Sequence, residues 1–233
     1  MKLVCLPFAG GNAQSYAQWK DLLGKEIEIV TIEYAGRGTR FCENLTDSCE
    51  STLEDIYPQM IKHIEQEYAL LGHSMGAIYA YELVKLIERD KRRKPVKIIV
   101  SGTDAPYVQD RKLLHNKTQK EFMKELHDLG SMPNEIMDDS ELSDLFYPIL
   151  HNDIRNLELY RLKHKNSEID RINSSLTVIY GTEDDEFDRQ RAAEWQKYST
   201  LPNTIHEFEG GHFFIFERKE EVCNFLRKKL LFY

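Results

Sequence analysis

A glycine-flanked serine constrains the fold of this chain more than any other feature of its sequence. Residues 72–76 read Gly-His-Ser-Met-Gly, with an apolar run at 68–71 before them and an apolar-rich segment at 77–84 after them. This pattern predicts a strand, a sharp turn and a helix, with Ser74 held at the turn in a strained backbone conformation and its hydroxyl exposed. The alternative is a glycine-flanked turn whose serine only caps the helix.

Predicted strands and helices alternate on both sides of this turn. The strands are expected at 2–8, 26–32, 68–71, 96–100, 175–180 and 204–208. Helices are expected after the first strand and at 52–66, 77–84, 191–198 and 219–230. Residues 33–51 have no clear period and predict a long loop, and Pro58 should kink its helix or mark a restart of it. The alternation predicts an α/β fold with a mostly parallel sheet flanked by helices.

The segment 103–172 interrupts this alternation, because its apolar residues recur at helical spacing and it contains no convincing strand. We therefore expect residues 1–102 and 173–233 to form the core, and 103–172 to form an inserted helical lid over the active-site end of the sheet. Some methionine and leucine side chains of this lid should face the site and form an apolar acyl pocket.

Composition narrows the classes of function that remain. The chain has 233 residues, of which 41% are hydrophobic, and a formal net charge of -8. That size suits one buried core, and the negative charge argues against nucleic-acid binding. No apolar run is long enough to cross a bilayer, so we expect a soluble, cytoplasmic protein. The four cysteines show neither a C-x-x-C pair nor metal-ligand spacing with histidine, which favours free thiols and no metal.

A serine hydroxyl needs a base, and His212 is the best placed of eight histidines. It lies in the loop Gly-Gly-His-Phe-Phe (210–214) directly after the last predicted strand, at the sheet end where α/β proteins carry their sites. Asp184 follows the strand that ends at Tyr180, and the order serine, aspartate, histidine is typical of a catalytic triad on this fold. Asp185 and Asp104 remain alternative acids, since one is adjacent and the other follows an earlier strand.

Two backbone amides should form an oxyanion hole. One is the amide of Met75, directly after the nucleophile. The other belongs to the glycine-rich loop after the first strand, where Ala9 is the favoured donor and Phe8 the alternative.

Six segments in this order resemble the type II (external, editing) thioesterases of nonribosomal peptide and polyketide synthesis. They are 5–11 with Tyr16 and Trp19, 34–40, 72–77, 101–106, 153–160 and 210–214. The resemblance implies an α/β-hydrolase fold and hydrolysis of misprimed or stalled acyl groups from the phosphopantetheine arm of a carrier protein. It also implies that Ser74, Asp184 and His212 are the triad and that Met75 and Ala9 donate to the oxyanion. Two positions depart from the family: Ala35 replaces a usual proline, and His151 a usual arginine.

Further expectations concern the substrate and its partners. We expect substrate contacts from Phe8, Met123, Leu126 and Phe146, with shallow acyl selectivity. The carrier protein should bind transiently to a monomer, and the chemistry requires no cofactor. Two other functions use the same residues: a carboxylesterase or lipase, and a ligand-sensing protein that keeps the fold. The sequence does not specify the acyl chain.

Overall fold

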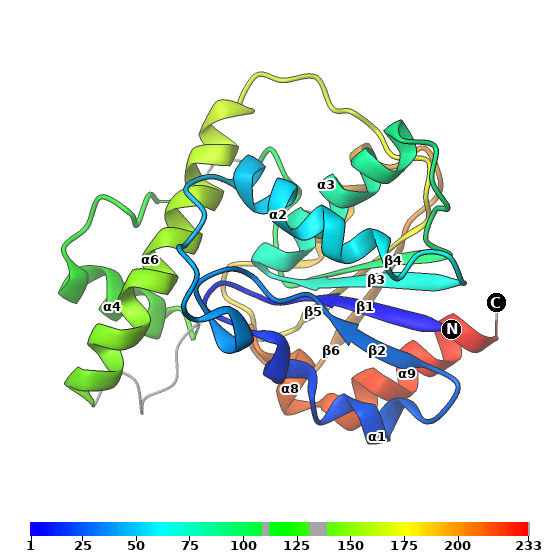
Figure 1. The fold of residues 1–233 in the computed structure, drawn as a ribbon, viewed down its shortest axis with the longest axis horizontal. Helices are drawn as coiled ribbons and strands as arrows, with labels where there is room; N and C mark the ends of the chain where they lie inside the picture. Colours follow the sequence, from blue (N-terminus) through cyan, green and yellow to red (C-terminus); the bar gives the residue numbers. More distant parts are fainter. Residues whose placement is uncertain (109–111, 131–138, 233) are drawn as a thin grey trace.

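A six-stranded parallel sheet forms the centre of the molecule (Figure 1). The computed structural model describes residues 1–108, 112–130 and 139–232. The strands lie in the order β2-β1-β3-β4-β5-β6, and every neighbouring pair is parallel. They are β1 (Lys2–Leu6), β2 (Glu28–Thr31), β3 (Tyr68–His73), β4 (Lys97–Ser101), β5 (Leu176–Gly181) and β6 (Thr204–Phe208). The predicted α/β-hydrolase arrangement, a mostly parallel sheet flanked by helices, is confirmed.

Helices cover both faces of the sheet. They are α1 (Trp19–Leu23), α2 (Cys49–Ile61), α3 (Met75–Arg89), α4 (Gln119–Asp128), α6 (Ser140–Lys163), α7 (Arg189–Glu194), α8 (Phe214–Glu217) and α9 (Lys219–Leu231). Short 3₁₀ turns occur at Ala13–Tyr16, Gly38–Arg40 and Trp195–Tyr198. None of the described helices combines the length and hydrophobicity required to cross a lipid bilayer.

The core consists of two apolar layers separated by the sheet. Residues of α2, α3 and α7 pack on one face, and residues of α1, α8 and α9 pack on the other. The strand β1 shows why both layers form, because Val4 and Leu6 join the first layer while Leu3 and Cys5 join the second. Side chains of a strand alternate between faces, so an uninterrupted apolar run serves both layers.

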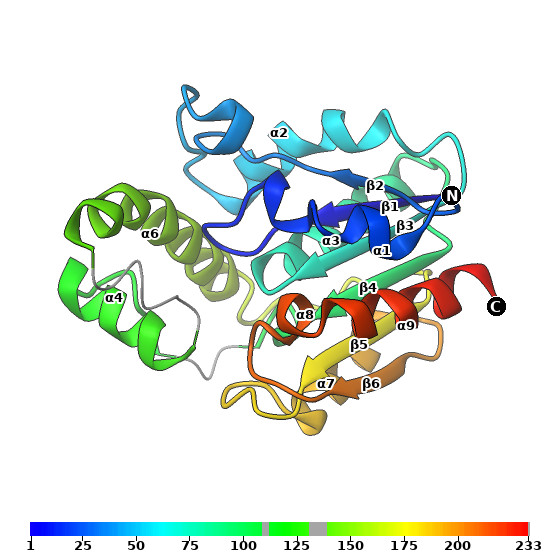
Figure 2. The same cartoon turned by 90° about the horizontal axis from the view of Figure 1, so that it is seen from below.

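A third, smaller apolar cluster lies beyond the carboxyl ends of the strands. Among the described residues between β4 and β5 there are the helices α4 and α6, and no strand. Phe122, Met123 and Leu126 of α4 pack there with Leu150 of α6. Figure 2 shows the two helices together at this end of the sheet, on the side opposite to the chain termini. The division into a core and a lid stays a prediction.

Several element boundaries differ from those expected. The first predicted helix consists of a 3₁₀ turn and the short α1. The helix α2 begins at Cys49, because the side chain of Ser48 accepts a hydrogen bond from the amide of Ser51 and Ser51 reciprocates in a capping box. It runs through Pro58 as one helix. The short α8 precedes the expected last helix.

Candidate active site

The backbone around Ser74 forms a strained strand-to-helix turn. Ser74 has φ 52° and ψ −120°, between the end of β3 and the start of α3. A non-glycine residue pays roughly 1–3 kcal/mol for such a conformation. The neighbouring glycines make it possible: a Cβ on Gly72 would lie 2.1 Å from the carbonyl oxygen of Gly76, and a Cβ on Gly76 would lie 2.1 Å from that of Leu6. The amide of Ser74 donates to the carbonyl of Ser101 at 2.8 Å.

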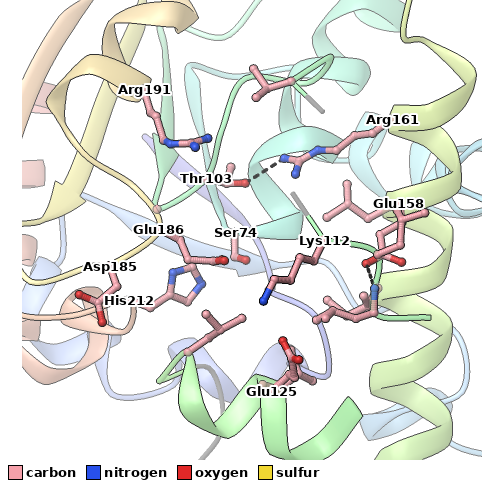
Figure 3. Close-up of a pocket in the computed structure, with 18 of the residues that line it drawn as sticks. Ser74, Thr103, Lys112, Glu125, Glu158, Arg161, Asp185, Glu186, Arg191 and His212 are labelled. Carbon is pink, nitrogen blue, oxygen red and sulfur yellow. Dashed lines mark hydrogen bonds between the residues drawn. The ribbon is translucent and has the colours of Figure 1, made fainter. Parts of the chain in front are cut away.

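Ser74 and His212 line the same pocket, which has a volume of about 430 Å³. Figure 3 shows the two side chains at neighbouring positions in it, with α6 forming the opposite wall. The loop that carries His212 packs on the end of β5, since a Cβ on Gly181 would lie 2.3 Å from the carbonyl oxygen of Gly210. The missing side chain at Gly181 therefore lets the loop after β6 pack closely on the end of β5.

Asp184 lies beside His212. Its Oδ2 is 2.9 Å from Nδ1 of His212, and its side chain is only 3% exposed. The other oxygen, Oδ1, accepts a hydrogen bond from the amide of Glu186 at 3.1 Å. An ionised carboxylate only accepts hydrogen bonds, so Nδ1 of His212 carries the proton and Nε2 is left as a base.

The two alternative acids occupy other positions. Asp104 is buried, and its Oδ1 accepts a hydrogen bond from Nη1 of Arg191 at 3.1 Å. Asp185 lines the pocket itself. Nδ1 of His212 donates its hydrogen bond to Asp184 rather than to either of these.

His73, inside the turn, is fully buried behind His212. Its Nδ1 lies 3.0 Å from Oγ of Ser101, and its ring centre lies 5.0 Å from that of His212. Burial of the ring holds the pKa of His73 well below its ordinary value, and the nearby His212 lowers it further. His73 therefore stays neutral and places no positive charge next to His212.

The amides of Met75 and Ala9 come from two segments in direct contact. Met75 is the first residue of α3, and Ala9 lies in the turn after β1. A Cβ on Gly76 would also lie 2.7 Å from the carbonyl oxygen of Pro7, which shows how closely α3 approaches this turn. Within the described part of the chain, neither amide has a protein acceptor. Both donors therefore remain available to a bound oxyanion.

The residues expected to contact substrate divide between the pocket and other places. Leu126 lines the pocket. Met123 and Phe146 pack instead in the contact between α4 and α6, because these helices bury their apolar stripes against each other. Phe8 packs edge-on against the rings of His73 and Phe213, with centres 5.9 and 4.9 Å apart, and borders a separate hollow. The substrate contacts expected from these last three residues stay predictions.

The pocket is also more polar than expected. One face of α6 contributes Ile154, Leu157, Glu158, Arg161 and Leu162. Other charged side chains complete the wall: Lys112, Glu125, Asp185, Glu186 and Arg191 (Figure 3). The sequence signal for this face was the helical spacing that continues past Leu157, but an analysis of apolar stripes alone misses its charged members.

Glu158 and His151 hold the segment before α4 against α6. The carboxylate of Glu158 accepts hydrogen bonds from the amides of Leu114 and His115 at 2.7 and 3.1 Å, and its Oε2 also contacts Nδ1 of His115. Nε2 of His151 donates to the carbonyl of His115 at 2.9 Å. His151, which replaces the arginine usual in the resembled family, therefore supports one wall of the pocket.

A buried ion pair joins α6 to the loop after β2, and sequence analysis missed it. Nη1 and Nη2 of Arg37 lie 2.5 and 2.7 Å from the two carboxylate oxygens of Asp153. Burial lowers the pKa of Arg37, but the hydrogen bonds and charge of Asp153 outweigh this and raise it above its ordinary value, so Arg37 remains a cation. Both residues lie in segments that resemble the thioesterase family, 34–40 and 153–160, and this was the one indication in the sequence that they matter.

Known thioesterases resemble this chain in sequence and in fold. A family model described as "Thioesterase domain" matches residues 1–230. The gramicidin S biosynthesis protein GrsT of Aneurinibacillus migulanus is 31% identical over 235 residues, which cover 99% of this chain and 89% of that protein. The crystal structure of ClbQ from the colibactin NRPS/PKS pathway is 30% identical, with a TM-score of 0.90 over 98% of this chain and 96% of that one. The type II thioesterase BorB from the borrelidin biosynthetic cluster is 26% identical, with a TM-score of 0.85 over 97% and 90% of the two chains.

Proposed function

The chain belongs to the thioesterase family, and from that premise we propose that it is a type II, editing thioesterase. It hydrolyses misprimed or stalled acyl groups from the phosphopantetheine arm of carrier proteins in nonribosomal peptide or polyketide synthesis. The pairing of Asp184 with His212, which lines the same pocket as Ser74, carries this proposal. The similarity to GrsT, ClbQ and BorB supports the substrate class.

In this mechanism Ser74 is the nucleophile. Nε2 of His212 takes the proton of Oγ as the oxygen attacks the thioester carbonyl, and Asp184 stabilises the imidazolium that forms. The amides of Met75 and Ala9 donate to the oxyanion. His212 then protonates the departing pantetheine thiolate. Water repeats the sequence on the acyl-enzyme with the same base, and the acid is released.

The pocket fits an enzyme with several acyl substrates. Its apolar residues can hold an alkyl chain, and its charged residues offer partners to polar groups on an acyl chain. The carrier protein is too large to enter, so only the pantetheine arm reaches Ser74. We propose that the carrier contact is transient and that the protein acts as a monomer.

A Ser74→Ala variant tests the proposal. We expect the rate at which the acyl thioester on a carrier protein is hydrolysed to fall by several orders of magnitude, because the triad acts as a unit. Intact-protein mass measures loss of the acyl group from the carrier. A fluorophosphonate should label Ser74 alone, and Ser15→Ala, outside this pocket, should behave as wild type.

Two results would contradict the proposal in different ways. Turnover of an aryl oxygen ester without turnover of the acyl carrier would indicate a carboxylesterase. Saturable binding of acyl-pantetheine with no turnover of either substrate would indicate a ligand-sensing protein.

A further inference from the structure

The turn after β1 offers two amide donors that the turn itself does not use. The amide of Gly11 donates to the carbonyl of Phe8 at 2.9 Å, and Gly10 has φ +76°. These are the features of a type II turn with Ala9 and Gly10 as its middle residues. The amide of Gly10 donates to Oδ2 of Asp153 at 2.8 Å. The amide of Ala9 is the proposed oxyanion donor.

Asp153 is itself held in place. It is 5% exposed, and Arg37 binds both of its carboxylate oxygens. The guanidinium of Arg37 lies over the ring of Tyr34, 5.2 Å from its centre, and the hydroxyl of Tyr34 donates to the carbonyl of Pro7 at 3.0 Å. The segment from Tyr34 to Arg37 therefore makes two connections to this part of the chain. Tyr34 bonds directly to Pro7, and Arg37 acts through Asp153.

We propose that Asp153 is a positioning residue for the oxyanion hole. The middle peptide of a β-turn has two orientations, those of type I and type II, and glycine permits both because it lacks a Cβ. The hydrogen bond from Gly10 to Oδ2 selects the type II orientation of the Ala9–Gly10 peptide. The same hydrogen bond anchors the turn to α6, and it thereby holds in place the preceding Phe8–Ala9 peptide, which carries the Ala9 N–H. This inference rests on the proposed function, in which that N–H stabilises the oxyanion.

A test must separate the effect of the Arg37–Asp153 ion pair from the effect of the hydrogen bond between Gly10 and Asp153. Removing one member of a buried ion pair leaves an uncompensated charge, which is strongly destabilising. We therefore compare two double variants, Arg37→Met with Asp153→Asn and Arg37→Met with Asp153→Leu. Both are neutral and similar in volume. Only the first keeps an oxygen that can accept from the amide of Gly10.

We expect the leucine double variant to have a kcat about 10- to 100-fold below that of the asparagine double variant, with KM equal within about threefold. Loss of a whole oxyanion donor costs about 10²- to 10³-fold in kcat, and a displaced donor keeps part of its effect. A trifluoromethyl ketone, which mimics the tetrahedral intermediate, should lose affinity in proportion to kcat. A thioether analogue of the substrate should bind both variants equally.

Equal kcat values in the two double variants, or a difference confined to KM, would overturn the inference. Asp55→Asn is the matched control, because Asp55 forms a similar two-contact pair with Arg40 in the same loop, at 2.6 and 2.8 Å. It should leave kcat unchanged. If neither double variant folds, Arg37→Lys is the substitute. It keeps the positive charge but cannot contact both oxygens of Asp153 at once. It should lower kcat with KM unchanged, and an unchanged kcat would overturn the inference.

Assays on an aryl thioester, in parallel with the acyl carrier, separate this inference from the proposed function. Both substrates form an oxyanion, so the effect of Asp153 should appear with either. A wild-type protein active only on the aryl thioester would contradict the carrier substrate and leave the positioning test intact. A wild-type protein active on neither would overturn both proposals.

Discussion

Three carboxylates, Asp184, Asp185 and Asp104, follow strand ends on the pocket side of the sheet. Among the described residues, Asp184 is the one that accepts from Nδ1 of His212, while Asp104 accepts from Arg191. The order of residues along the chain favoured Asp184 but left the choice open. The buried hydrogen bond supplies a physical criterion, because an acid that orients the base must contact it.

Asparagine at each of these positions, measured side by side, tests the assignment. Asp184→Asn should lower kcat by about 10⁴-fold, since an amide favours the wrong tautomer of His212. Asp185→Asn and Asp104→Asn should change kcat less than about tenfold. A crippled Asp104→Asn with an active Asp184→Asn would place the acid after β4 instead.

At the scale of single elements, the strands and the order of their polar ends were predictable from the sequence. Ser74, Asp184 and His212 each follow the carboxyl end of a strand, and parallel strands bring these ends to one edge of the sheet. The inner face of α6 was not predictable from apolar spacing. This helix has one face against the core, with Asp153 and Tyr160 buried, and another against the pocket, with Glu158 and Arg161. A single apolar stripe cannot describe two such faces.

Leu126 of α4 is the one residue of the expected acyl contacts that lines the pocket. We expect Leu126→Trp to lower kcat/KM for an octanoyl group on a carrier protein at least about tenfold. The kcat/KM for a carrier-bound acetyl group should stay within about threefold of the wild-type value. The added ring excludes several methylenes, each worth about 1 kcal/mol. Leu145→Trp on an exposed part of α6 is the control. An equal loss for both chain lengths would show that the ring damages the site rather than limits its length.

For the molecule as a whole, the spacing of apolar residues predicted the sheet and its covering helices. It did not predict the contacts that join segments distant in sequence. The Arg37–Asp153 pair spans 116 residues of sequence and appears only when α6 and the loop after β2 are placed together. Stability also depends on such buried polar groups. Because His73 is buried and neutral, the stability of the folded protein should depend on pH.

The folded protein should therefore lose stability as the medium becomes acidic. Burial holds the pKa of His73 well below 6.5 in the folded state, so the unfolded chain takes up a proton first as the pH falls below about 6.5. The free energy of unfolding should decrease by up to about 1.4 kcal/mol per pH unit for this one proton. Urea unfolding of wild type and His73→Gln between pH 8 and 5 measures it. Equal pH slopes in the two proteins would assign the effect to other groups.

The first residue and the end of α9 lie on the side of the sheet opposite α4 and α6 (Figures 1 and 2). A molecule tethered to a bead or sensor surface through either end will therefore turn its pocket toward the solution. Carrier proteins supplied in flow can then approach the pocket without obstruction from the support. The position of the chain ends thus suits this protein to real-time measurement of the proposed binding to carrier proteins.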